Sequence, residues 1–288
     1  MPIVTLVPVW LLALAVFWLP VRWIWDVPFW LFALGHLCAV VVMFWRPLQT
    51  VLVMRMLGGR RATPDQARRL EPAWRSVAQQ LGIEPRRYAL AVLPSDELNA
   101  FACGGSLLVV TSYAIETLPR DEMTGVLAHE LAHHLGFHTV ALTVRQWLSL
   151  PIFLLAQVGF FLQNVATAAT GSYVSHSSAL SAVGRLISAV LKAFSWIFLL
   201  GLLISNRIAD RAGRRAEFEA DRRAVVMGFG RELATALRRV EQYERSGRGT
   251  DTSTLRATLV LTHPSARSRV QRIEALRRRE AMRQRSTR

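Results

Sequence analysis

Residues 127–134 read LAHELAHH and contain the pattern His-Glu-x-x-His. The surrounding sequence predicts a helix over residues 119–136, with acidic residues in its first turn and apolar residues at helical spacing. On a helix, residues four apart lie one turn along on the same face. We therefore expect His129 and His133 to direct two imidazoles at one metal ion, with Glu130 beside them as general base. The alternative is a surface helix that carries these residues by chance.

A tight zinc site needs a third ligand, and the sequence offers two places for it. The metzincin pattern puts a third histidine where Thr139 stands, and His138 is one residue out of register, so that interpretation fails. Residues 217–221 read EFEAD, and their two outer carboxylates again stand one helical turn apart. We expect Glu217 to be the third ligand, and Asp221 to orient a ligand imidazole through its other ring nitrogen.

Two further segments extend this pattern. Residues 99–104 read NAFACG, and residues 262–269 begin with THP and end on Arg269. Together with the two zinc segments, they make the chain resemble the HtpX/Ste24-type integral-membrane zinc metalloproteases, with the four elements in the family's order. One departure is Ser265, where many members carry a second proline. The resemblance favours the HtpX-like branch, because the branch that processes prenylated proteins has more membrane spans.

The resemblance also implies roles for residues outside the zinc motif. Its N-A-F-A segment is an edge strand that holds extended substrate by backbone hydrogen bonds. Here those residues are Asn99, Ala100, Phe101 and Ala102. The alternative is a strand that only packs. His263 and Arg269 are candidate catalytic donors to the oxyanion, with a helix-start and ion-pair role as their alternative.

The composition indicates a membrane protein. Hydrophobic residues make up 52% of the 288 residues, the mean hydropathy is +0.26, and the apolar residues gather into long runs. The formal net charge is +15, and arginines flank the apolar runs. We assign this charge to membrane-surface attraction and expect no nucleic-acid partner. Cys38 and Cys103 form no Cys-x-x-Cys motif, which fits a reducing compartment.

Four apolar runs are candidates for transmembrane helices. They cover residues 3–21, 27–45, 147–166 and 186–205. Arginine is dense in the flanks at 46–61 and 207–215 but sparse in the links at 22–26 and 168–185. The positive-inside rule then predicts a multi-pass protein of the cell (inner or plasma) membrane, with both termini and the zinc site on the cytoplasmic side.

The predicted fold is a mainly α membrane protein with about four transmembrane helices and a zincin-type α+β catalytic domain. Strand signals at 88–93, 98–103 and 107–111, the last two joined by a Gly104-Gly105 turn, predict a small antiparallel sheet. The expected division is a transmembrane hairpin at 1–46, half of the protease domain at 47–144, a second hairpin at 145–205 and the other protease half at 206–288.

The predicted function is that of a membrane-embedded zinc metalloendopeptidase at the cytoplasmic membrane face, with one zinc ion per chain. Its expected partners are the lipid bilayer and protein or peptide substrates, misfolded membrane proteins above all, in quality control or a stress response. One alternative is a membrane sensor or signalling protease that cleaves one partner, although the outward links are short for a ligand-binding domain. Another is a non-catalytic membrane scaffold, against which the intact base and ligand set argues.

Overall fold

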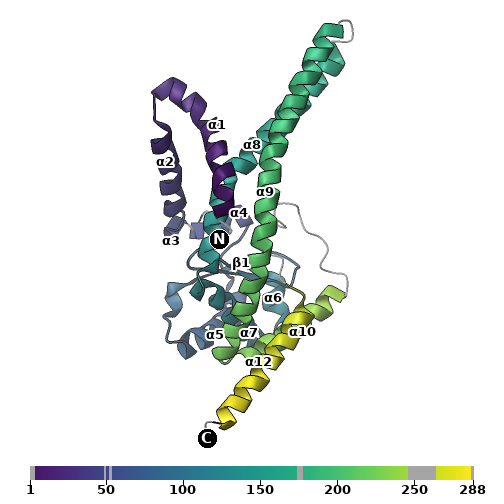
Figure 1. Ribbon diagram of the computed structural model, residues 1–288. Coiled ribbons are helices and arrows are strands. Elements are labelled where there is room, and N and C mark those ends of the chain that lie inside the picture. Colours follow the sequence, from purple (N-terminus) through teal and green to yellow (C-terminus); the bar gives the residue numbers. More distant parts are fainter. Residues whose placement is uncertain (1–3, 49, 52–53, 174–177, 246–263, 287–288) are drawn as a thin grey trace. The chain divides into compact units, whose positions relative to one another are not determined.

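The computed structural model describes residues 4–48, 50–51, 54–173, 178–245 and 264–286 (Figure 1). The chain divides into two compact units, one of Met1–Val41 with Val144–Asp210, the other of Val42–Thr143 with Arg211–Arg288. Helices dominate both units. His263, a candidate catalytic residue, lies outside the described residues.

Long apolar helices build the first unit. They are η1 (Val4–Leu6), α1 (Val7–Trp25), α2 (Phe29–Val42) and the apolar parts of α8 (His138–Tyr173) and α9 (Ser178–Val226). Among the described residues, the segments long and apolar enough to cross a membrane are Val4–Trp25, Thr139–Val165 and Ala182–Ile204.

The second predicted span is shorter than expected. α2 has 14 residues, which is about 21 Å of helix, whereas the hydrocarbon core of a bilayer is about 30 Å thick. Pro28 directly precedes the helix, and the chain turns after Val42 before Arg46-Pro47. Proline disfavours helical backbone in the residue before it, so Pro28 limits the start of α2.

Close contacts hold the helices of the first unit together. The Trp10 indole N–H on α1 donates to Nδ1 of His36 on α2, with a donor–acceptor distance of 3.3 Å. A Cβ at Gly159 on α8 would lie 2.0 Å from the hydroxyl oxygen of Ser195 on α9. Small residues at such positions let helix backbones approach closely in a membrane.

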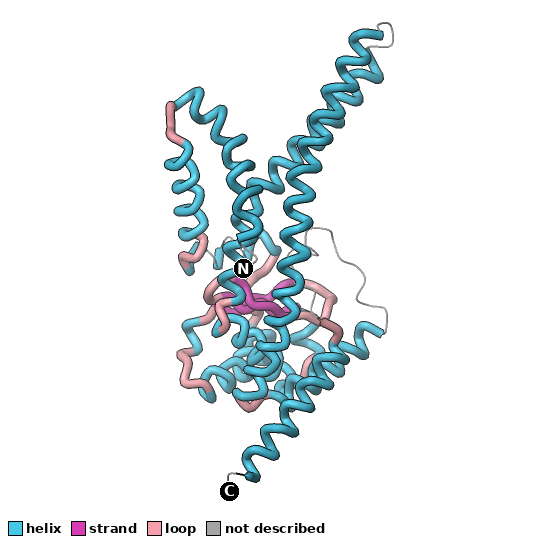
Figure 2. The backbone as a smooth tube through the Cα atoms, viewed as in Figure 1, coloured by secondary structure: helices cyan, strands magenta, loops and turns pink. Residues whose placement is uncertain are grey.

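The second unit combines a small sheet with several helices, as Figure 2 shows for the strands in magenta. Its helices are α3 (Arg46–Leu48), α4 (Met54–Leu57), α5 (Pro64–Gln80), η3 (Pro85–Arg87), α6 (Ser112–Thr117), α7 (Arg120–Leu135), α10 (Gly230–Arg245) and α12 (Ala266–Ser286). α5 begins at a capping box, in which the Thr63 and Gln66 side chains each accept from the other's backbone N–H.

The sheet has the order β1-β3-β2, with β1 at Ala89–Leu93, β2 at Ala100–Cys103 and β3 at Leu107–Thr111. The antiparallel prediction holds for β2 and β3, which the predicted glycine turn connects. It is corrected for β1, which pairs with β3 in parallel. Every residue of β3 is buried, which suits a central strand covered on both faces. The chain therefore passes from β1 to the far edge before it returns through the middle.

The hydrophobic core fixes the helix that carries the zinc motif. α5 contributes Leu70 and Trp74, and α7 contributes Leu127 and Leu131, to one buried cluster with Leu108 of β3. Each of these side chains is at most 3% exposed. Their burial holds α7 against the sheet, and its position decides where the motif lies.

Candidate metal centre

Five predicted site residues from two helices meet in the interior of the second unit. α7 contributes His129, Glu130 and His133, and α9 contributes Glu217 and Asp221. All five side chains are buried, with exposed fractions of 0–4%. α7 starts after Pro119 and ends at Gly136, as its sequence predicts. A residue spacing of four on both helices directs each pair toward the other helix.

Three donor atoms lie at the mutual distances that a small tetrahedral ion requires. Nε2 of His129 is 3.2 Å from Nε2 of His133. The Glu217 carboxylate lies 3.5 Å from the first of these nitrogens and 3.0 Å from the second. Ligands about 2.05 Å from a tetrahedral zinc are about 3.3 Å from one another. His129, His133 and Glu217 therefore form a possible metal site whose donor spacing fits zinc.

The charge of the site also favours a divalent cation. Glu130, Glu217 and Asp221 are buried carboxylates, and Arg269 is the buried cation beside them. The three carboxylates outnumber this one cation, and buried charges are normally paired or bound to metal. Burial and the nearby Arg269 lower the pKa of His129, but hydrogen bonds to Asp221 and Glu217 outweigh both and raise that pKa to about 9. The carboxylates thus stabilise positive charge at this position.

Asp221 contacts the far side of the His129 imidazole. Its Oδ1 lies 3.0 Å from Nδ1 of His129. Because an ionised carboxylate only accepts, Nδ1 is the donor and Nε2 is left to face the other donor atoms. Burial raises the pKa of Asp221, but the hydrogen bond from His129 and the charge of Arg269 lower it further, to about 2. The contact expected from the sequence is present in the structure.

The Glu130 carboxylate faces both the donor atoms and strand β2. Its Oε1 is 4.0 Å from Nε2 of His129, and its Oε2 accepts the backbone N–H of Ala102 at 2.8 Å. Ala102 lies on β2, whose neighbour in the sheet, among the described residues, is β3. Thr111 N–H donates to the Asn99 carbonyl, so alternate β2 residues Ala100 and Ala102 turn their backbone groups away from β3. The structure therefore brings the N-A-F-A segment next to the expected base.

Arg269 reaches the site from the first turn of α12. Its Nε and Nη2 donate to the two oxygens of Asp221, at 3.0 and 2.7 Å. Its Nη1 is 3.5 Å from the Glu217 carboxylate. The guanidinium is thus in contact with the residues of the metal centre, whereas no position is described for its expected partner, His263.

His134, the third histidine of the motif segment, is a structural contact that sequence reasoning did not identify. Its Nε2 is 3.3 Å from the Leu107 carbonyl, and its Nδ1 is 3.1 Å from the Thr139 hydroxyl. Because the carbonyl only accepts, Nε2 carries the proton and Nδ1 accepts from the hydroxyl. Burial lowers the pKa of His134 to about 4, so the ring is neutral. It ties the end of α7 to β3.

Glu122 is a second contact that the sequence did not reveal. Its position in the first turn of α7 predicts a role at the helix dipole, but the residue is 5% exposed. Both of its oxygens accept from Arg239 on α10, at 2.6 and 2.9 Å. The partners are 117 residues apart in the chain, and only the placement of Glu122 on the buried face of α7 hints at this pairing.

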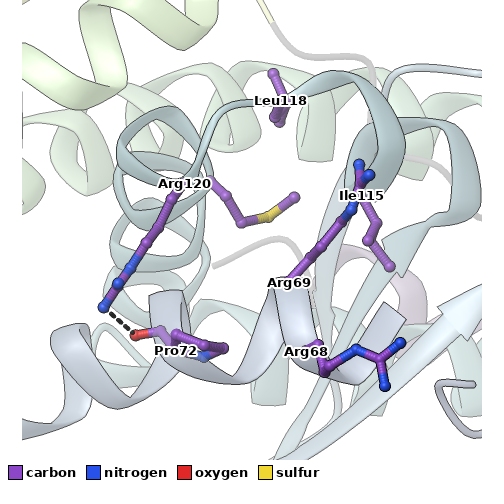
Figure 3. Close-up of a pocket in the computed structure, with 7 residues that line it drawn as sticks. Arg68, Arg69, Pro72, Ile115, Leu118 and Arg120 are labelled. Carbon is purple, nitrogen blue, oxygen red and sulfur yellow. Dashed lines mark hydrogen bonds between the residues drawn. The ribbon is translucent and has the colours of Figure 1, made fainter. Parts of the chain in front are cut away.

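Two surface cavities lie among other residues of the second unit. One, of about 320 Å³, lies between α5 and the α6–α7 segment and is lined by arginines over apolar side chains (Figure 3). The other is lined by Glu274, Arg277, Arg278 and Ala281 of α12. None of the described residues lining either cavity belongs to the metal centre. The buried His, His and Glu cluster is therefore the better candidate for chemistry.

Comparison with known proteins agrees with this geometry. A "Protease HtpX homolog" of Acidiphilium cryptum (strain JF-5) is 28% identical over 242 residues, which cover 77% of this chain and 78% of the relative. A protein of the same name from Gemmatimonas aurantiaca (strain DSM 14586 / JCM 11422 / NBRC 100505 / T-27) is 28% identical over 229 residues, covering 78% and 74%.

The fold is similar to that in the crystal structure of S. mikatae Ste24p, with a TM-score of 0.51 at 17% identity. The match covers 90% of this chain and 62% of that chain, so this protein spans under two thirds of the solved structure's length. The family model of peptidase family M48 matches residues 64–277, which include every described residue of the metal centre. The chain therefore belongs to peptidase family M48, in agreement with its resemblance to HtpX/Ste24-type membrane metalloproteases.

Proposed function

We propose that this protein is a zinc metalloendopeptidase that hydrolyses peptide bonds at the cytoplasmic face of the cell membrane. The observation that carries the proposal is the tetrahedral spacing of the donor atoms of His129, His133 and Glu217, with the Glu130 carboxylate beside them. One zinc ion per chain fits this donor set. Residues 47–144 and 206–288 form the protease domain in this proposal, and residues 1–46 and 145–205 the membrane part.

In the proposed reaction, each side chain of the site has its own role. When bound, zinc supplies Lewis acidity toward a carbonyl oxygen and makes water more acidic. Glu130 accepts the proton of the attacking water and delivers it to the leaving amine. The Ala102 N–H holds one Glu130 oxygen at 2.8 Å, which limits the directions the carboxylate can take. Asp221 keeps Nε2 of His129 available as a ligand atom.

Strand β2 supports a role in substrate binding. Ala100 and Ala102 turn backbone groups toward the open side of the sheet, and Ala102 lies within hydrogen-bond distance of Glu130. An extended peptide that adds to this edge would carry its backbone past the base. Asn99, Ala100, Phe101 and Ala102 are therefore assigned to substrate binding by main-chain contacts, which accept many sequences.

The proposed substrates are misfolded or otherwise accessible membrane proteins, in quality control or a stress response. Thr139, the first residue of one candidate span, lies six positions after the ligand His133 in the sequence. Glu217 lies 13 positions after Ile204, the last residue of another. Few residues therefore separate the proposed ligands from the candidate membrane spans in the sequence. Arginines flanking the spans support the cytoplasmic orientation.

The test compares the wild-type protein with Glu130→Gln in detergent or proteoliposomes, using an unfolded or membrane-embedded protein as substrate. Glutamine keeps the shape and the Ala102 hydrogen bond but cannot accept the proton, so we expect full zinc content and at least a 100-fold loss of cleavage, about the contribution of a general base. Glu71→Gln is a matched control, because Glu71 is exposed on α5 and pairs with Arg75. Cleavage by Glu130→Gln at close to the wild-type rate would show that the proposed mechanism is wrong.

A further inference from the structure

Arg269 is the only described residue of α12 whose charge is buried in the metal centre. Its side chain is 5% exposed, and those of Asp221 and His129 are 0% and 3% exposed. Water therefore has little access to replace one partner when another moves. The direction of each group is set by the neighbouring protein atoms.

The contact between Arg269 and Asp221 uses two donors of the guanidinium. Nε and Nη2 reach different oxygens of the carboxylate, at 3.0 and 2.7 Å. Such a fork fixes the plane of the carboxylate as well as its distance, which a single point charge does not do. The orientation of Asp221 is thus determined from α12, although Asp221 itself lies on α9.

The same Asp221 oxygen serves two partners. Oδ1 accepts from Nη2 of Arg269 and lies 3.0 Å from Nδ1 of His129. Nη2 also lies 3.2 and 3.0 Å from the two nitrogens of the His129 ring, so the guanidinium packs along that ring. On the other side, Nη1 is 3.5 Å from Glu217. One arginine therefore borders both a histidine and a carboxylate of the proposed ligand set.

We propose that Arg269 is a positioning residue of the metal centre, which fixes Asp221 and, through it, the direction of the His129 ring. This inference rests on the proposed function, because it takes His129 and Glu217 as zinc ligands. It differs from a role in which Arg269 donates to the reacting carbonyl. A positioning residue changes how tightly zinc is held, whereas a donor to the transition state changes turnover at full zinc occupancy.

The experiment measures zinc affinity by chelator competition on the purified full-length chain, and peptide cleavage over a range of zinc concentrations. Arg269→Lys keeps a positive charge next to Asp221 but lacks the fork, so the fold should be retained. We expect zinc affinity to fall about 10- to 100-fold, as for other groups that orient a ligand, and cleavage to recover at saturating zinc. Asp221→Asn should weaken zinc binding by a similar factor, since it alters the same contact.

Arg239→Gln is the matched control. Arg239 makes a two-bond contact of the same kind with the buried Glu122, at the opposite end of α7 from His133. Its loss should lower the unfolding temperature and leave zinc affinity within about twofold of wild type. If Arg239→Gln weakens zinc binding as much as Arg269→Lys, general destabilisation explains the effect and the inference is wrong.

Other outcomes also distinguish the possibilities. Unchanged or tighter zinc binding by Arg269→Lys overturns the positioning role, and lost cleavage at saturating zinc then assigns Arg269 to the transition state. A wild-type protein that binds no zinc contradicts the proposed function itself. Wild-type binding with an unaffected Arg269→Lys variant contradicts only the present inference.

Discussion

Gly125→Ala tests how closely α7, the helix of the His-Glu-x-x-His motif, must approach α10. Gly125 lies one turn before His129 on α7. A Cβ built there would be 2.3 Å from the Leu233 nitrogen and 2.5 Å from the Glu232 carbonyl carbon. Because these are backbone atoms, no side-chain rotation relieves the overlap, and α10 has to move by about 1 Å to restore van der Waals contact.

The sign of the effect follows from two opposing contributions. Alanine in a helix interior is favoured over glycine by about 0.5–1 kcal/mol. Overpacking costs about 1–3 kcal/mol, and a Cβ only 2.3 Å from a backbone atom favours the upper part of that range, about 2–3 kcal/mol, so the net destabilisation should be about 1–2.5 kcal/mol. For a unit of this size, the unfolding temperature should fall by about 2–10 °C. The fall is measured by the thermal unfolding of the detergent-solubilised protein, with tryptophan fluorescence as the signal.

Gly213→Ala on α9 is the matched control, because a Cβ there has no heavy atom within 4 Å. The same substitution should raise the unfolding temperature by about 1–4 °C through helix propensity alone. An unchanged or higher unfolding temperature in Gly125→Ala would falsify the close-packing argument. Equal shifts of both variants in one direction would show that packing at Gly125 does not matter.

Three further predictions concern metal, acidity and topology. Glu217→Ala should reduce zinc from about one ion per chain to a small fraction in metal analysis, and full zinc content would remove Glu217 from the ligand set. Burial raises the pKa of Cys103 to about 11. In a Cys38→Ser background its alkylation rate should therefore rise about tenfold per pH unit between pH 7 and 10, whereas a plateau near pH 9 would indicate an ordinary thiol. In a background lacking both cysteines, a cysteine at Asp26 should react with an impermeant reagent outside intact cells and one at Ser268 should not; the reverse pattern would invert the proposed orientation.

Local chemistry made several parts of this protein predictable. The helix over residues 119–136 has start and stop signals and an apolar face, and it is observed as Arg120–Leu135. The capping box at Thr63 and the glycine turn after β2 are likewise interactions between residues a few positions apart. Such signals depend on dihedral preferences and short-range hydrogen bonds, which are set by neighbouring residues and do not depend on the tertiary fold.

Features that depend on contacts between distant segments were harder to predict from the sequence. The sequence indicates three strands but not that β3 lies between the other two and runs parallel to β1. The order of the strands depends on which strand the core covers on both faces, and that strand is β3. It indicates an apolar run over 27–45 but not the short helix Phe29–Val42 that forms there. It also leaves open that a single helix, Ser178–Val226, carries both a candidate span and the EFEAD segment.

The sequence by itself determined which residues could bind a metal, because helical spacing of four predicts that the donors of each pair face one way. It thus identified His129, His133 and Glu217, whose side chains the structure brings together. The tertiary structure alone decided what surrounds them: the Ala102 N–H on Glu130 and the Arg269 fork on Asp221. These contacts join residues 28 and 48 positions apart. Their geometry arises from the packing of α7, α9, α12 and the sheet, which no local pattern encodes.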